Sequence, residues 1–279
     1  MSATLYLVAT PLGNAQDLSP RAREVLERVD LIYCEDTRTS SRLFSYLGLQ
    51  VSTLRSLHAH NEAERRPEIL AALKEGKELA IVSDAGTPAI SDPGALVVEA
   101  ALEEGLRVSP IPGACAVSTL MSAAGLPGAH YLFLGFLPKN KGARRKILEA
   151  RLQAGAVLVF YMPMRDLPTV AREIERLAPS ALCVLGRELT KIHEEVLRLE
   201  AGPFAEELES RERLLGEATV VVALPEDSEN ALSPGKVEAI EQAWARLLDG
   251  GFTRRDAREI VVGLTGLSKS RVKKILQDP

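Results

Sequence analysis

The chain has 279 residues, of which 46% are hydrophobic and 26% charged, so its composition is globular and its length allows two domains and a small appendage. The net charge of −4 excludes a uniformly basic coat for nucleic acid but leaves room for a local basic patch. Three widely spaced cysteines, and no apolar run near the roughly 18 residues of a membrane-spanning helix, exclude a disulfide scaffold and predict a cytoplasmic protein without a membrane partner.

The first part of the chain alternates predicted strands, turn-rich loops and helices. Strands are predicted at residues 5–8, 31–34, 79–82 and 108–111. Helices are predicted from Pro20 with Ser19 as N-cap, at residues 39–47, from Asn61 with Glu64 in a capping box, at 95–104 and at 114–124. This alternation predicts an α/β domain with a mostly parallel sheet over residues 1–113.

Three loops of this domain follow predicted strands, at residues 9–14, 35–38 and 83–94. In parallel sheets, ligands bind at the carboxyl ends of the strands, where such loops lie. The loop at 83–94 has two Gly, two Pro, two Asp, two Ser and a Thr, residue types used where backbone bends and approaches a ligand closely. We interpret it as a rigid ligand loop; the alternative is an ordinary strand-to-helix connection.

A second alternating block predicts another α/β domain over residues 114–225. Strands are predicted at residues 131–135, 156–162, 181–185, 195–199 and 219–224, and helices at 142–153 and 167–177. The short spacing near residues 186–200 favours antiparallel pairing in this block.

The last part of the chain predicts a separate small helical domain. Residues 225–235 are polar and rich in turn formers, which is typical of a linker. Residues 234–279 then predict three helices with a helix-turn-helix outline, and they carry nine Lys and Arg against six Asp and Glu. This net charge of +3 fits a tail that touches nucleic acid, and a dimerisation or capping helix set is the alternative.

Several familiar sites are absent from the sequence. No G-x-x-x-x-G-K-[ST], G-x-G-x-x-G or G-x-S-x-G motif is present, which excludes a P-loop and disfavours a dinucleotide fold or a hydrolase elbow. His58 and His60 form a lone H-x-H pair without a nearby third ligand, so we expect no metal. The remaining Gly- and Pro-rich loops suit a ligand with an amino-acid end, a sugar and a base, whose own reactive atom does the chemistry.

The three loops, together with residues 111–113, 133–138, 160–162 and 187–195, resemble the ribosomal RNA small subunit methyltransferase I branch of the tetrapyrrole methylase superfamily. The resemblance covers essentially the whole chain, and the ordered string at 83–94 is its most specific part. It implies two α/β domains with the cofactor cleft between them, usually in a homodimer. It also implies methyl transfer from S-adenosyl-L-methionine to the 2′-hydroxyl of a cytidine ribose, with 16S rRNA or the 30S subunit as partner.

The resemblance implies a set of cofactor contacts in this chain. They are Pro11, Leu12, Gly13, Asp84, Gly86, Thr87, Ala89, Ile90, Ser118, Tyr161, Met162, Leu189, Thr190 and Ala218. Thr87 stands where porphyrin-modifying relatives have Asp, and this departure favours the RNA branch. For Ser118 and Met162, plain packing is the alternative.

The mechanism requires a proton acceptor or orienting group for a ribose hydroxyl, which is a poor nucleophile. The candidates at strand ends are Glu35, Asp36, Asp84, Asp92, Glu188 and His193. We choose Glu188 as base or substrate orienter, because it follows Arg187 in a loop expected at the cleft.

RNA binding requires cations for the phosphates. The predicted RNA contacts are Lys139, Lys141, Arg144 and Arg145 after the first strand of the second domain, and Arg254, Arg255, Lys269, Arg271 and Lys273 in the tail. The alternative for these charges is a solvated surface. Two other functions compete with RNA methylation: a small-molecule methyltransferase of the same fold, and an RNA-binding assembly factor without enzymatic activity.

Overall fold

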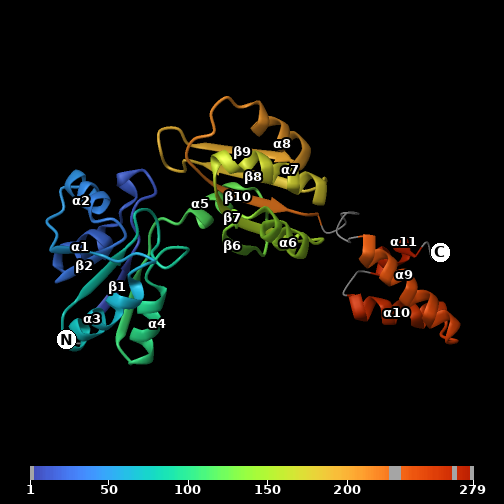
Figure 1. Ribbon diagram of the computed structural model, residues 1–279, viewed down its shortest axis with the longest axis horizontal. Helices are drawn as coiled ribbons and strands as arrows, with labels where there is room; N and C mark the ends of the chain where they lie inside the picture. The colour runs from blue at the N-terminus through green and yellow to red at the C-terminus, as the bar shows by residue number, and fades with distance from the viewer. Residues whose placement is uncertain (1–2, 226–233, 266–268, 277–279) are drawn as a thin grey trace.

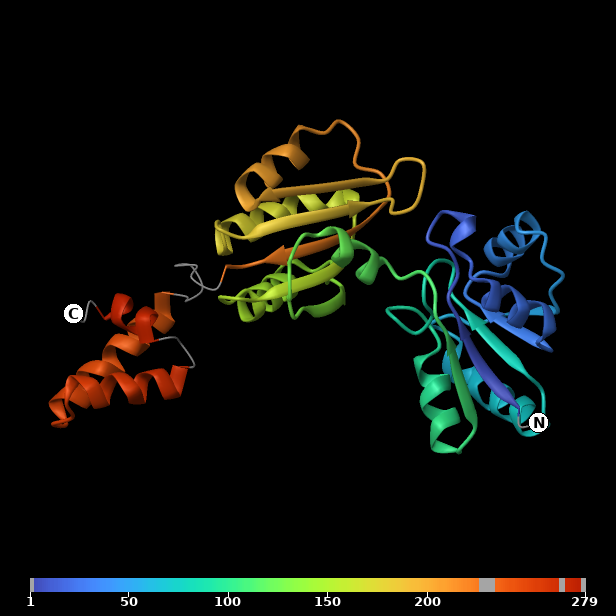
Figure 2. The ribbon, with the colours of Figure 1, turned by 180° about the vertical axis from the view of Figure 1, so that it is seen from behind.

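The structure is a computed structural model that describes residues 3–225, 234–265 and 269–276. Two α/β units, each built on one sheet, lie side by side, and three helices follow the second unit (Figure 1). Figure 2 shows from behind that the chain crosses from the first unit to the second through α5 (Ala116–Ala123). The predicted fold class, two α/β domains with a small helical C-terminal part, is confirmed.

The first sheet has five parallel strands in the order β3-β2-β4-β1-β5. The strands are β1 (Thr4–Val8), β2 (Leu31–Cys34), β3 (Thr53–Ser56), β4 (Leu79–Val82) and β5 (Arg107–Ile111). The helices between them are α1 (Pro20–Arg28), α2 (Thr37–Tyr46), α3 (Glu62–Lys74) and α4 (Ala95–Glu103), with a 3-10 turn η1 at Ala15–Asp17. Strand β3 was not predicted, and its four residues are exposed or only partly buried.

Helices cover both faces of this sheet, because side chains alternate along each strand. Leu5 and Leu7 of β1 pack with α3 and α4, whereas Tyr6 and Val8 pack with α1 and α2. Parallel strands with both faces buried read as continuous apolar runs, as Leu79–Val82 does. The central strands are therefore fixed rigidly, and their carboxyl ends hold the three loops at one edge.

The second sheet is mixed, in the order β6-β7-β10-β8-β9, and only the β6–β7 pair is parallel. Its strands are β6 (Leu132–Phe136), β7 (Val157–Pro163), β8 (Leu182–Arg187), β9 (Glu195–Glu200) and β10 (Glu217–Ala223). Its further helices are α6 (Lys141–Arg151), α7 (Leu167–Leu177) and α8 (Ala201–Ser210), with a 3-10 turn η2 at Met164–Asp166. Helices α6, α7 and α8 cover one face, and α5 covers the other. Antiparallel pairing near residues 186–200 is confirmed; α8 was not predicted.

Of two predicted N-terminal helix caps, the structure confirms the one at α1 and contradicts the one at α3. At α1 the Ser19 side chain accepts a hydrogen bond from the Ala22 N–H, as predicted. At α3 the predicted capping box is wrong: Asn61 makes no side-chain cap. Its Oδ1 instead accepts a hydrogen bond from the His58 N–H at 2.8 Å, because it closes the turn between β3 and α3.

The C-terminal helices are α9 (Pro234–Asp249), α10 (Arg254–Thr265) and α11 (Lys269–Ile275). They share a small core of Ile240, Val261 and Val272. Most of the predicted linker and the turn before α11 lie outside the described residues. Within the described ranges, no helix combines the length and the apolar character needed to cross a membrane.

Candidate functional site

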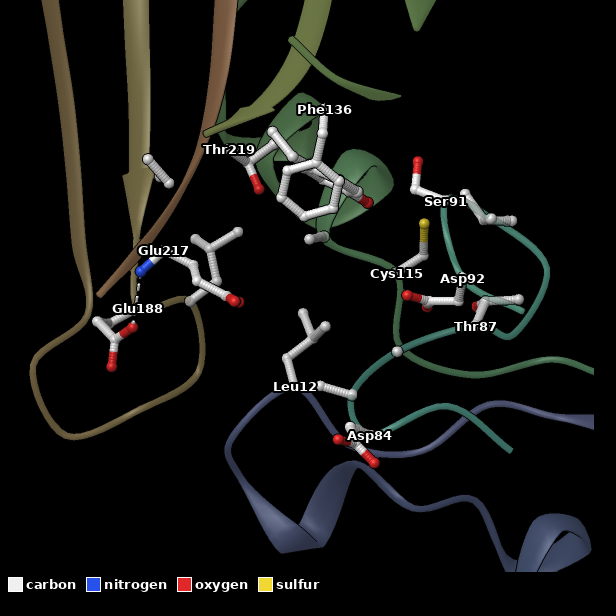
Figure 3. Close-up of a pocket in the computed structure, with 18 of the residues that line it drawn as sticks. Leu12, Asp84, Thr87, Ser91, Asp92, Cys115, Phe136, Glu188, Glu217 and Thr219 are labelled. Atoms are coloured by element: carbon white, nitrogen blue, oxygen red, sulfur yellow. Dashed lines mark hydrogen bonds between the residues drawn. The ribbon is translucent and has the colours of Figure 1, made fainter. Parts of the chain in front are cut away.

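A pocket of about 380 Å³ lies between the two α/β units. Its lower and right-hand sides in Figure 3 come from the loops at the carboxyl edge of the first sheet, which contribute Leu12, Asp84 and Thr87. Its other wall comes from the second unit, where β6 and β8 end and β10 begins. Such a volume is in the range of small-molecule sites, and the predicted meeting of the loops at 9–14, 35–38 and 83–94 is confirmed.

The loop at 83–94 is tightly tied to its neighbours. Thr10 and Gly86 exchange both backbone N–H to O=C hydrogen bonds, at 2.9 and 3.0 Å. The Thr87 hydroxyl donates to the Ala114 carbonyl at 2.9 Å, which joins this loop to the segment before α5. Ala89 and Ser91 have φ of 65° and 66°, a left-handed conformation that is costly for residues other than glycine. The surroundings therefore impose the loop's shape.

A buried carboxylate from α3 holds the far end of this loop. Glu62 is 6% exposed, and its Oε1 accepts hydrogen bonds from the N–H groups of Gly94 and Leu96, both at 2.9 Å. These amides start α4, where the helix dipole and unpaired N–H groups favour a negative charge. Glu62 thus anchors the loop to the first unit.

The opposite wall includes a loop between β8 and β9 that reaches back to the first unit. The Asn14 N–H donates to Thr190 Oγ1 at 3.0 Å, and a Cβ on Gly13 would lie 2.2 Å from Lys191 Cγ. Only glycine fits at position 13 without displacing that side chain. The first-strand loop and the loop after β8 are therefore in direct contact.

Glu188 lies at the start of this loop, with a φ of 48°. Its Oε1 accepts hydrogen bonds from Lys191 Nζ at 3.1 Å and from the Glu217 N–H at 3.2 Å. Figure 3 draws the bond from Glu217 as a dashed line. Partial burial alone raises the pKa of Glu188, but these hydrogen bonds and the Lys191 charge outweigh it and lower the pKa. The carboxylate is held ionised, which suits orientation of a donor better than uptake of a proton.

The pocket interior is acidic. Burial, and then the charge of Glu35, raises the pKa of Asp92 from 3.8 to about 7. Burial also raises the pKa of Glu35 and of Asp84. Carboxylates crowded in a partly desolvated site favour either a proton or a cationic ligand. The pocket is therefore suited to a positively charged small molecule.

Nine of the predicted cofactor and catalytic residues line this pocket. They are Leu12, Asp84, Gly86, Thr87, Ile90, Tyr161, Glu188, Leu189 and Ala218. Six do not line it: Pro11, Gly13, Ala89, Ser118, Met162 and Thr190. Gly13 and Thr190 instead make the contact between the two loops described above. The Ser118 hydroxyl donates to the Cys115 carbonyl within its own helix.

The predicted contact between the Met162 side chain and the cofactor is not supported by the structure. It is 3% exposed and packs in the core beneath α6, α7 and α8. Its neighbour Tyr161 lines the pocket, and consecutive strand residues point to opposite faces of a sheet. The Met162 side chain therefore points away from the site.

Arg144 is likewise a correction to the predicted RNA contacts. Its guanidinium is buried and donates to both carboxylate oxygens of Glu173, at 2.9 and 3.0 Å. A cation enclosed in this way cannot meet a phosphate. Lys139, Lys141 and Arg145 are exposed, and Arg145 is paired with Glu149.

The predicted cations of the tail are distributed over α10 and α11. Arg254, Arg255 and Lys269 are exposed, Lys273 is half-buried, and Lys269 pairs with Glu259. The side chain of Arg271 lies outside the described residues.

Several pocket residues were absent from the predicted cofactor set. Those that carry polar or aromatic groups are Glu35, Ser91, Asp92, Cys115, Phe136, Lys191, Glu217 and Thr219. Glu35 and Asp92 follow β2 and β4, and the sequence predicts them only as candidate bases. A position after a parallel strand is also typical of a ligand contact. Glu217 has no such signal, because it starts an antiparallel strand. Within the described part of the chain, no group of three His, Cys, Asp or Glu side chains could hold a metal ion.

Comparisons with known proteins agree with this geometry. The model of the family described as Tetrapyrrole (Corrin/Porphyrin) Methylases matches residues 4–205. The chain is 42% identical over 276 residues to a "Ribosomal RNA small subunit methyltransferase I" from Pseudomonas aeruginosa, covering 97% of this chain and 95% of that one. It is 38% identical to the protein of the same name from Micromonospora olivasterospora, covering 97% and 85%.

A solved structure shares the fold. It is uroporphyrin-III C-methyl transferase from Thermus thermophilus complexed with S-adenyl homocysteine, with a TM-score of 0.54 and 18% identity, covering 79% of this chain and 97% of that one. At 18% identity this likeness shows the fold alone. The family model shows membership of the tetrapyrrole methylases, and the two relatives place the chain in one branch of that family. The chain therefore belongs to the ribosomal RNA small subunit methyltransferase I family of the tetrapyrrole methylases.

Proposed function

We propose that this protein transfers a methyl group from S-adenosyl-L-methionine to the 2′-hydroxyl of a cytidine ribose in 16S rRNA of the small ribosomal subunit. The single observation that carries the proposal, beside family membership, is the acidic pocket between the two units. Burial is the main cause that raises the pKa of Glu35, Asp84 and Asp92, so a nearby cationic group of a ligand would stabilise the ionised form of these carboxyls. A sulfonium with an α-ammonium group supplies such a positive charge.

The residues present fit this cofactor. The pocket combines carboxylates for the positive charges with Gly86, Leu189 and Ala218, small or apolar groups that leave backbone accessible to a ligand. When bound, S-adenosyl-L-methionine supplies an electrophilic methyl group. We assign its contacts to Leu12, Asp84, Gly86, Thr87, Ile90, Asp92, Tyr161, Leu189 and Ala218.

The protein contributes to the reaction by positioning the cofactor and the ribose hydroxyl and by placing charges near them. The ties from Glu62 and Thr87 keep the loop at 83–94 in one shape, which reduces the ordering that binding requires. Glu188, ionised and held by two hydrogen bonds, is placed to accept a hydrogen bond from the ribose hydroxyl and orient it. Asp92 is better suited to hold a proton near neutral pH.

The remaining expectations also belong to this proposal. RNA phosphates would meet Lys139, Lys141 and Arg145 and the cations of the tail. We further propose three units at residues 1–113, 114–225 and 234–279, a homodimer, and a cytoplasmic location. Sedimentation of the purified protein tests the homodimer directly.

One assay separates this function from its rivals. Labelled S-adenosyl-L-methionine is offered with 30S subunits, naked 16S rRNA and a porphyrinogen in parallel. Label in rRNA at a 2′-hydroxyl is expected. Label only in the porphyrinogen would support a small-molecule methyltransferase, and a lack of cofactor binding by calorimetry would support an RNA-binding factor without enzymatic activity.

A further inference from the structure

Strand β6 changes its course directly beside the pocket. Its pairing with β7 shifts register between Phe133 and Phe136, and Gly135 has a φ of 65°. Glycine adopts this left-handed conformation without strain. Irregularities of this kind occur next to active sites, where they re-aim a side chain. The side chain that follows is Phe136, which lines the pocket.

The Phe136 ring is exposed to the pocket and is not buried in the core. It is 53% exposed, although Phe44, Phe160 and Phe204 are all at most 1% exposed. Figure 3 shows it pointing into the pocket. Its centroid lies 5.2 Å from that of Tyr161, edge to face, and Tyr161 contacts Phe133 in the same way at 5.0 Å. The ring is thus supported from the protein side and retains free surface for a ligand.

This ring also adjoins the loop proposed for the cofactor. A Cβ on Gly135 would lie 3.1 Å from Ser91 Oγ, so the irregular part of β6 rests against the loop at 83–94. A flat group on Phe136 would therefore lie close to that loop. A substrate group held there would lie next to the proposed cofactor contacts.

Charge changes sign between the pocket and the chain just beyond Phe136. Lys139 and Lys141 are exposed and have no acidic partner among the residues that the structure describes, whereas Arg144 and Arg145 from the same run are paired. The carboxyl groups of Glu35 and Asp84 in the pocket interior make it unfavourable for a phosphate. An RNA strand would keep its phosphates at the lysines, and only an uncharged base and its ribose could enter.

We propose that Phe136 is the stacking platform for the nucleobase of the methylated nucleotide, with Lys139 and Lys141 at its flanking phosphates. The inference rests on the proposed function and adds the substrate subsite to it. Stacking on an aromatic ring is a common way to hold an unpaired RNA base, and it tolerates any base. The adenine of the cofactor is the competing occupant.

The test compares Phe136→Leu, Phe136→Trp and a matched control, Tyr46→Leu, which alters a 79% exposed aromatic at the end of α2. Steady-state methylation of 30S subunits gives kcat and KM for RNA, and calorimetry gives the Kd for S-adenosyl-L-methionine. We expect Phe136→Leu to raise the RNA KM about 10-fold to 100-fold, the range expected for one lost stack, with the cofactor Kd within about twofold. Phe136→Trp and Tyr46→Leu should stay within a few-fold of wild type.

A second pair of substitutions tests the inference independently of the Phe136 variants. Lys139→Gln combined with Lys141→Gln should raise the RNA KM and flatten its dependence on salt, because two phosphate contacts are lost. An unchanged RNA KM in Phe136→Leu would overturn the inference. So would a cofactor Kd weakened as much as the RNA KM, which would place adenine on the ring. Failure of wild type to methylate any rRNA would instead overturn the proposed function.

Discussion

The carboxylate of Glu62 accepts a hydrogen bond from the backbone N–H of Gly94 at 2.9 Å. The two residues are 32 positions apart, and Gly94 ends the loop that forms one wall of the pocket. With a φ of 122°, Gly94 has a backbone conformation that side chains rarely allow. A buried charge on α3 therefore fixes the shape of a loop that the proposed cofactor would contact.

Substituting Glu62→Gln should loosen this loop. The neutral amide keeps one acceptor oxygen but loses the charge that strengthens hydrogen bonds to N–H groups, and we expect a loss of about 1–2 kcal/mol in unfolding free energy. The Kd for S-adenosyl-L-methionine should rise by roughly fivefold or more, since about 1 kcal/mol of loop ordering then opposes binding. Urea unfolding and calorimetry measure the two effects.

The control for this experiment is Glu64→Gln, in the same helical turn but exposed. It should change neither quantity measurably. A Glu62→Gln protein that binds the cofactor as tightly as wild type would show that the loop keeps its shape without this charge.

Asp92 should make cofactor affinity depend on pH. Its raised pKa, about 7, means that the unliganded pocket holds a proton there below pH 7. A cationic ligand favours the ionised form, so the affinity for S-adenosyl-L-methionine should increase from pH 6 to pH 8, with proton release near pH 7. Calorimetry in two buffers of different ionisation enthalpy measures this release. S-adenosylhomocysteine, which lacks the sulfonium charge, should depend less on pH.

Asp92 should also make the free energy of unfolding depend on pH. This free energy should fall as pH rises, whereas the cofactor affinity should increase. Because the folded pKa lies above the unfolded value of 3.8, the folded state binds the proton more tightly, and unfolding free energy should fall as pH rises from about 4 to about 7. Asp92→Asn should flatten this slope in cofactor-free protein. An unchanged slope in the variant would assign the pH dependence to Glu35 or Asp84, whose pKa values are also raised.

Removal of the Glu188 carboxylate should slow turnover more than it weakens cofactor binding. We expect Glu188→Ala to lower kcat about tenfold or more, because the orienting acceptor and its ties to Lys191 and Glu217 are lost together. Glu188→Gln, which keeps an acceptor, should retain part of the activity. Glu212→Ala, an exposed change nearby in the chain, is the control. Turnover within a few-fold of wild type at saturating substrate would rule out this role.

The ion pair of Arg144 and Glu173 should matter for stability and not for RNA. Both side chains are at most 6% exposed, and Arg144→Met would leave a buried carboxylate without its partner. Loss of one member of such a pair costs about 3–5 kcal/mol. Chemical denaturation should show this loss for Arg144→Met and less than about 1 kcal/mol for Arg145→Met, whose exposed pair contributes little. The RNA KM of folded Arg144→Met should equal that of wild type; a raised value would restore Arg144 to the RNA contacts.

Local sequence patterns are enough to predict the alternation of strands and helices, the parallel first sheet and the three loops at its carboxyl edge. These follow from signals that act over a few residues: apolar periodicity, the Ser19 cap, and the Gly and Pro content of residues 83–94. The ordered string in that loop, taken with the other loop motifs, also indicated the family that the comparisons show. Local signals failed where a short segment such as β3 gains its place from pairing with a neighbour.

Which side chains serve the site depends on contacts that form only in the folded protein. Within one cationic run, Arg144 is buried against Glu173 while Lys139 and Lys141 stay exposed, and within one strand Tyr161 faces the pocket while Met162 faces the core. The shift of β6 at Gly135 and the reach of Glu62 to Gly94 are equally invisible in the sequence. The physical reason is that burial, ion pairing and strand register depend on partners far along the chain, and the chain brings those partners together only when it folds.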